Sequence, residues 1–174
     1  MPYEFSILNL IQGLRTPMFD QIVIFITSLA NYVWYILIIG LLLNKPTRKI
    51  GVVLVVAMIL QYLINAGILK HLFARVRPCN VYTTVELLIK RPKGFSFPSG
   101  HSAAPFCVVG VLYGAKIREL FWPVFVLAIL IGFSRLYLYV HFPTDVFVGA
   151  LCGFAIGYGV LRAFVICMRN KKLY

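Results

Sequence analysis

Long apolar runs separated by short charged segments dominate the chain. A helix needs about 20 mostly apolar residues to cross a bilayer, within a range of roughly 17–25. The clearest run, residues 50–69, carries no charge, and further runs cover residues 99–115, 120–140 and 143–168. Residues 28–44 form an earlier run that polar side chains interrupt near its start. The pattern therefore predicts about five transmembrane helices.

The segment before these runs has the pattern of an amphipathic helix. Apolar residues recur at i, i+3, i+4 and i+7, as expected for one helix face: Ile7, Leu10, Ile11 and Leu14. Asn9 and Gln12 fall outside that face. Because such a helix can lie flat on a membrane, we predict that residues 1–27 form an interfacial N-terminal segment. The alternative is one long, tilted span that begins near Gln21.

The composition is typical of a membrane protein. Of the 174 residues, 61% are hydrophobic and 13% are charged, against about half and about a quarter in ordinary soluble domains. The net charge is +12. In a soluble protein this excess would suggest nucleic acid, but no soluble basic face remains once the spans are assigned, so membrane lipids are the expected partners. We predict a single all-α domain over residues 1–174, an integral membrane helical bundle.

Polar residues suited to catalysis or ligand binding fall into three clusters at the ends of predicted spans. The first lies at residues 70–78, the second at residues 98–101, and the third joins residues 134–135 to residues 141–145. If the spans alternate in direction, all three clusters reach the same membrane face. We therefore expect residues 70–145 to carry one site.

The expected site has an excess of cations. Charges near hydrocarbon need a partner or a role, yet the chain has only 5 Asp and Glu residues. Lys70, Arg77 and Arg135 would converge with only one carboxylate, Asp145, nearby. Phosphate is the natural counter-charge, because Arg offers a planar fork to its oxygens and Lys offers a point charge.

The second cluster adds a backbone site for an anion. Ser99 follows Pro98 and is a good N-cap for the next helix. The first backbone N–H groups, near Gly100 and His101, would then point outward and form an anion site. Gly100 allows a ligand to approach the backbone closely.

The third cluster supplies a nucleophile. Pro143 suits the first turn of a helix, which places His141 just before that helix and Asp145 inside its first turn. The carboxylate can then hold one imidazole nitrogen and leave the other free to attack phosphorus. A second imidazole, His101, can protonate the leaving oxygen. The same histidines with Asp145 could form a metal site, but the surrounding cations would repel a metal.

These patterns resemble the type 2 phosphatidic acid phosphatase superfamily. The family pattern reads K-x6-R-P, then P-S-G-H, then S-R-x5-H-x3-D. Every position matches here, spacing included: Lys70-x6-Arg77-Pro78, Pro98-Ser99-Gly100-His101 and Ser134-Arg135-x5-His141-x3-Asp145. The family's lipid phosphatases usually have six spans, so the first of these has no counterpart among the five expected here.

The resemblance implies a role for each motif residue. His141 would form a phosphohistidine, Asp145 would orient it, and His101 would act as the general acid. The remaining motif residues would hold the phosphate oxygens: Lys70, Arg77, Ser99, Gly100 and Arg135. The resemblance implies no metal and no cofactor.

The predicted function is that of a membrane lipid phosphatase acting on a lipid phosphate or pyrophosphate. The short chain and the small basic loop favour a compact headgroup such as that of undecaprenyl pyrophosphate. A glycerolipid phosphate, either phosphatidic acid or phosphatidylglycerophosphate, is the alternative substrate, and lipid A is a third. An alternative of another class is a transporter of anionic lipid or phosphate, which would need the charges but no oriented nucleophile.

The distribution of Lys and Arg indicates an orientation. Nine fall on the face opposite the site: Lys45, Arg48, Lys49, Lys116, Arg118, Arg162, Arg169, Lys171 and Lys172. The other eight fall on the site's own face, and removing Lys70, Arg77 and Arg135 leaves five. Cytoplasmic loops carry the excess of positive residues. We therefore expect the site to face outward. The compact chain and the family resemblance favour a bacterial plasma membrane.

Overall fold

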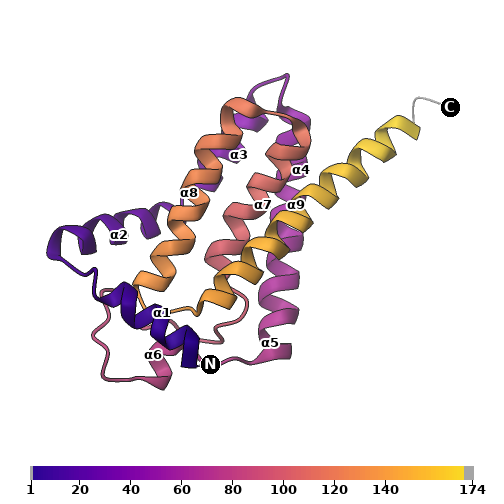
Figure 1. Ribbon diagram of the computed structural model, residues 1–174. Coiled ribbons are helices and arrows are strands. Elements are labelled where there is room, and N and C mark those ends of the chain that lie inside the picture. Colours follow the sequence, from indigo (N-terminus) through magenta and orange to yellow (C-terminus); the bar gives the residue numbers. More distant parts are fainter. Residues whose placement is uncertain (1, 171–174) are drawn as a thin grey trace.

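The computed structural model describes residues 2–170, which form a bundle of helices without a strand (Figure 1). In chain order the helices are α1 (Pro2–Gln12), α2 (Pro17–Leu29), α3 (Val33–Leu43), α4 (Arg48–Tyr62), η1 (Leu63–Leu69), α5 (Lys70–Phe73), α6 (Pro78–Val81), α7 (Gly100–Ala115), α8 (Arg118–Tyr137) and α9 (Pro143–Asn170). The predicted basic tail with Lys171 and Lys172 lies outside the described residues. The all-α prediction is confirmed.

Apolar helices of membrane-spanning length make the protein an integral membrane protein. In the described part of the chain, three stretches are long and apolar enough to cross a bilayer: Arg48–Val81, Arg118–Tyr137 and Pro143–Asn170. Helices α2 and α3 would together add a fourth, although they are bent by 40°. The predicted span over residues 28–44 is therefore broken, because the chain turns between Leu29 and Val33. The predicted span over residues 99–115 corresponds to α7, which has only 16 residues.

Helix α7 lies in the centre of the bundle, against α4, α8 and α9. Glycines on α9 bring these two backbones into direct contact. A Cβ added at Gly149 would lie 2.5 Å from the carbonyl oxygen of Ser99, and one at Gly153 would lie 2.1 Å from that of Ala103. Small residues at four-residue spacing allow such close packing of membrane helices. The contact fixes the start of α7 against the start of α9.

Helix α1 lies across the end of the bundle where α8 ends and α9 begins (Figure 1). Gln12 donates a 2.7 Å hydrogen bond to the carbonyl of Tyr137, and the Tyr139 hydroxyl bonds to Asn9 at 3.0 Å. Because the polar side of α1 is held by the protein, most of its predicted apolar face points outward: Ile7, Leu10 and Leu14 are exposed. An outward apolar side suits contact with lipid, and the interfacial position of residues 1–27 stays a prediction.

Candidate active site

The three sequence clusters meet at the end of the bundle that carries α1, α5 and α6 (Figure 1). Lys70 begins α5 and Arg77 immediately precedes α6. Ser99 and the first residues of α7 form the second part. Arg135 lies in the last turn of α8 and Asp145 in the first turn of α9, with His141 in the connection between them. Local helix ends therefore place every predicted site residue at the same level of the bundle.

His141 is buried between a guanidinium and a carboxylate. Its Nε2 atom lies 3.1 Å from Nη1 of Arg77, and its Nδ1 atom lies 3.5 Å from Oδ2 of Asp145. A guanidinium can only donate, so Nε2 must be the accepting nitrogen and the ring proton must be on Nδ1. The contact with Arg77 sets the tautomer and turns the Nε2 lone pair towards that guanidinium.

Burial keeps the His141 imidazole neutral. It lowers the pKa of His141 to about 3; the Asp145 carboxylate opposes this shift, whereas the Arg77 and Arg135 guanidinium groups favour it. A pKa this far below neutrality leaves the ring uncharged at physiological pH. A neutral imidazole retains the lone pair that a nucleophile needs.

Asp145 is held on both carboxylate oxygens. Its Oδ2 accepts hydrogen bonds from the Ser96 hydroxyl and, at 2.8 Å, from the backbone N–H of Phe142. Its Oδ1 accepts a 2.6 Å bond from Nη1 of Arg75. The carboxylate is fully buried. Its position beside the His141 ring is therefore fixed independently of that ring.

Arg75 connects the site to the N-terminal helix. Besides Asp145, its guanidinium forms an ion pair with Glu4 of α1 and packs over the Phe142 ring, 4.0 Å from the ring centroid. Glu4 also accepts a 2.6 Å hydrogen bond from the Thr144 hydroxyl. Neither Glu4 nor Ser96 was among the predicted site residues. The scarcity of acids was a signal for Glu4, whereas nothing in the sequence distinguishes Ser96.

The three predicted phosphate-binding cations are held by uncharged oxygens. Arg77 donates to the carbonyls of Gly94 and Phe95, both at 3.0 Å, and Lys70 donates to the carbonyl of Phe95 at 2.9 Å. Arg135 donates to the Thr27 hydroxyl at 2.6 Å, and its Nε has no hydrogen-bond partner within residues 2–170. None of the three forms an ion pair with a described carboxylate. Their charge is thus available to an anion.

The start of α7 agrees with the sequence in position but not in its cap. Ser99 is the N-cap residue, yet its side chain makes no capping hydrogen bond. Its oxygen accepts instead from the hydroxyl of Ser102 at 3.1 Å. The first N–H groups of a helix have no partner within that helix, so those at Gly100 and His101 keep the predicted character of an anion site. In the described chain no three His, Cys, Asp or Glu side chains cluster as metal ligands would.

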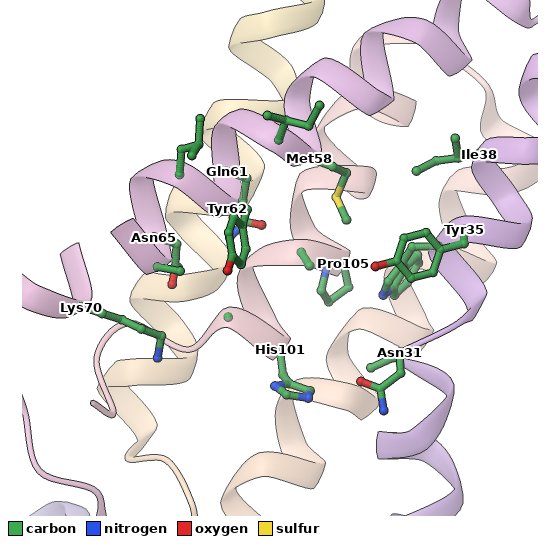
Figure 2. A pocket seen from close by; sticks show the side chains of 17 residues that line it. Asn31, Tyr35, Ile38, Met58, Gln61, Tyr62, Asn65, Lys70, His101 and Pro105 are labelled. Carbon is green, nitrogen blue, oxygen red and sulfur yellow. The ribbon is translucent and has the colours of Figure 1, made fainter. Parts of the chain in front are cut away.

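A cavity of about 550 Å³ opens beside the site between α3, the α4–η1 helix and α7. Lys70, Gly100 and His101 line one end of it, and mostly apolar side chains line the rest (Figure 2). Two lining side chains, Asn65 and Trp34, have buried polar atoms without a hydrogen-bond partner among the described residues. The cavity is large enough for part of a lipid.

Comparison with known proteins gives a consistent result. Residues 50–169 match the PAP2 superfamily. An undecaprenyl-diphosphatase of Sulfolobus acidocaldarius is 32% identical over 123 residues, which are 71% of this chain and 59% of that protein. The chain therefore spans less than two thirds of that relative. The undecaprenyl-diphosphatase BcrC of Bacillus subtilis is 30% identical over 177 residues, covering 93% of this chain and 88% of the relative.

The fold has a counterpart among solved structures. The crystal structure of Aquifex aeolicus LpxE superposes with a TM-score of 0.79 at 33% sequence identity. The match covers 91% of this chain and 94% of that one. The likeness therefore extends well beyond the region that carries the motifs.

Proposed function

This chain belongs to the PAP2 superfamily and is an integral membrane lipid phosphatase, and we propose that its substrate is an isoprenoid lipid diphosphate of the undecaprenyl pyrophosphate kind. The single observation that carries the chemistry is the His141 ring, which is neutral and lies beside Arg77 and Arg135, two cations without acidic partners. Two relatives are named undecaprenyl-diphosphatases, and the small basic loop near the site suits a compact diphosphate headgroup.

The proposed reaction has two steps on one histidine. The Nε2 lone pair of His141 forms a bond to the terminal phosphorus while the bond from phosphorus to the leaving oxygen breaks. With the negatively charged substrate bound beside it, His101 carries a proton and gives it to the leaving oxygen. Water then attacks the phosphohistidine and loses a proton to His101, and the P–N bond breaks to release inorganic phosphate. Asp145 stabilises the Nδ1–H side of the ring throughout.

The cations and the start of α7 would hold the transferred phosphoryl group. Lys70, Arg77 and Arg135 supply charge, and the backbone at Gly100 with the side chain of Ser99 supplies donors on the opposite side. Arg77 would exchange its contact with Nε2 of His141 for a phosphate oxygen, which frees the lone pair for attack. The carbonyls of Gly94 and Phe95 keep this side chain in place.

The cavity gives the lipid a place on the leaving-group side. His101 lies on the cavity side of the start of α7 and is partly exposed, whereas His141 is buried. Attack from His141 would therefore expel the leaving group towards His101 and the cavity. Apolar residues farther along the cavity, including Ile38, Met58 and Pro105, suit the first isoprene units (Figure 2).

We place the protein in a bacterial plasma membrane with the site facing outward. The charge distribution supports this orientation, because the turns between α3 and α4 and between α7 and α8 lie at the end away from the site (Figure 1). Lys45 and Lys116 lie in those turns, and Lys49 lies in the first turn of α4. Positive loops of this kind stay on the cytoplasmic side.

Release of inorganic phosphate by detergent-purified protein tests the proposal. Undecaprenyl pyrophosphate, phosphatidic acid and phosphatidylglycerophosphate are compared in EDTA, with His141→Ala as the matched inactive control. We expect release that EDTA leaves unchanged, that the variant loses, and that is fastest with the diphosphate. Faster release from a glycerolipid would replace the proposed substrate. No release from a wider lipid panel would favour the anionic-lipid transporter.

A further inference from the structure

Asn65 is a buried amide without a hydrogen-bond partner. Its side chain is 2% exposed, and neither Oδ1 nor Nδ2 is hydrogen-bonded to another described residue. An unsatisfied amide in an apolar setting costs roughly 1–3 kcal/mol. The family motifs do not include this position. A buried amide of this kind needs a reason, and a ligand that supplies the missing partner is one.

The local helix geometry directs Asn65 to the catalytic end of the cavity. Residues Leu63–Leu69 form a π-helix, in which the backbone N–H of Lys70 bonds to the carbonyl of Asn65. This i→i+5 bond places Asn65 one turn above Lys70 on the same face. Single π-helical turns inside α-helices occur frequently at functional sites. Figure 2 shows Asn65, Lys70 and His101 around the same end of the cavity.

Gly100 leaves the space between the amide and α7 open. A Cβ built at Gly100 would lie 4.0 Å from Oδ1 of Asn65, the one atom within that distance. The side-chain oxygen therefore lies towards the first residues of α7, next to His101, and the amide nitrogen of the same group has no partner among the described residues. In the proposed reaction His101 contacts the leaving oxygen. Asn65 thus lies on the leaving-group side of the scissile bond, beyond the phosphoryl group that His141 attacks.

We propose that Asn65 donates from Nδ2 to the inner phosphate of a lipid diphosphate and so selects diphosphates over monophosphates. The inference rests on the proposed function, because a prenyl monophosphate has only hydrocarbon at this position. Lys70, one turn away, would hold the terminal phosphoryl group next to it. A neutral amide suits this position, because it adds a directed donor without another buried charge.

The test compares two substrates that differ only in the inner phosphate, farnesyl diphosphate and farnesyl monophosphate. Asn65→Leu removes the donor at nearly constant volume. We expect kcat/KM for the diphosphate to fall at least about tenfold, the effect of losing a hydrogen bond to a charged group. The value for the monophosphate should stay within about twofold. The ratio of the two is the readout, because a merely structural defect lowers both values together.

Two variants serve as controls. Gln61→Leu removes a second buried amide from the same cavity, one turn farther from Lys70, and should leave the ratio unchanged. Asn65→Asp keeps the shape and places a carboxylate against the inner phosphate, so it should lower the ratio further than Asn65→Leu. It also covers the case in which the leucine variant does not fold, as judged by thermal unfolding in detergent.

The outcomes separate the inference from its premise. Wild-type protein that releases no phosphate from farnesyl diphosphate overturns both. If the wild type is active but the Asn65 variants lower kcat/KM equally for both substrates, or for neither, the inference alone is overturned. If the Asn65 variants lost kcat/KM selectively for phosphatidic acid, the inference would also be overturned, because the amide would then bind an ester carbonyl of that lipid.

Discussion

The two sides of α7 are packed in opposite ways. Towards α9 the helix has no free space: a Cβ at Gly153 or Gly157 would lie about 2 Å from a carbonyl oxygen of α7, at 2.1 Å and 2.0 Å. Towards α3 and η1 the same helix borders a cavity of about 550 Å³, lined by Gly100, His101 and Ala104. One helix thus has a closed side and an open side.

The difference separates two tasks. The closed side fixes Ser99 against the start of α9, where its backbone N–H donates a 2.9 Å hydrogen bond to the carbonyl of Asp145. It therefore determines the distance between the predicted phosphate-binding turn at the start of α7 and the His141–Asp145 pair. In the proposed reaction the open side receives the leaving group. We therefore expect backbone contact on one side to set the geometry of the site, and side chains on the other side to select the substrate.

The largest effect is expected on the closed side. Gly153→Val should prevent close packing of α7 and α9 and destabilise the protein by more than about 3 kcal/mol, because backbone atoms cannot yield to the new side chain. Gly159→Val on the same helix is the control, since a Cβ there meets nothing within 4 Å. Thermal unfolding in detergent measures both. Equal melting temperatures for the two variants would contradict direct backbone packing of α7 against α9 at Gly153.

A smaller effect, and one on activity alone, is expected for the histidine on the open side. His101→Ala should lower kcat for a phosphate monoester by roughly 10²–10⁴-fold, the usual contribution of general acid catalysis. The loss with a lipid diphosphate should be less, because a phosphate leaves more readily than an alkoxide. Steady-state kinetics with matched prenyl substrates measures this. An equal loss for both would mean that His101 does not protonate the leaving group.

Filling the open side should affect long lipids only. Ala104→Phe places a ring in the cavity, and we expect kcat/KM for undecaprenyl pyrophosphate to fall about tenfold through lost apolar contact. Dimethylallyl diphosphate, with one isoprene unit, should be hydrolysed as by the wild type. If Ala104→Phe also lowered kcat/KM for dimethylallyl diphosphate, the lipid tail would not be the part of the substrate that occupies this cavity.

The smallest effect concerns pH. The pKa of His141 is lowered from 6.5 to about 3 by burial, so the unfolded chain takes up a proton at His141 before the folded protein does. This contribution to stability is complete above pH 6.5 and is lost as the pH falls towards 3. The melting temperature should decline by a few degrees less in His141→Asn than in the wild type between pH 7 and pH 4.5. Parallel declines would contradict a neutral, buried His141.

The sequence predicted what depends on local pattern. Helix ends, the placement of Pro143 and the spacing of His141 and Asp145 follow from neighbours along the chain, and the structure reproduces them. The boundary between the N-terminal segment and the first span was predicted at residue 28, a few residues before the break between Leu29 and Val33. The PAP2 superfamily resemblance was confirmed, but the roles of the site residues stay predictions.

Contacts between distant segments could not be predicted. Glu4 and Arg75 pair across 71 positions, and Ser96 reaches Asp145 across 49. Such pairs are decided by packing and have no periodic signature. The polar contacts of α1 were not predicted either, because they depend on which groups the junction of α8 and α9 offers to Gln12 and Asn9.

The most direct test of the account is to identify the residue that carries the phosphoryl group. A lipid diphosphate labelled in its terminal phosphate is mixed with excess enzyme, turnover is quenched in alkali, and the labelled peptide is sequenced by mass spectrometry. The account predicts phosphohistidine at His141, absent from His141→Ala. Label on any other residue, or phosphate release by His141→Ala at the wild-type rate, would contradict it.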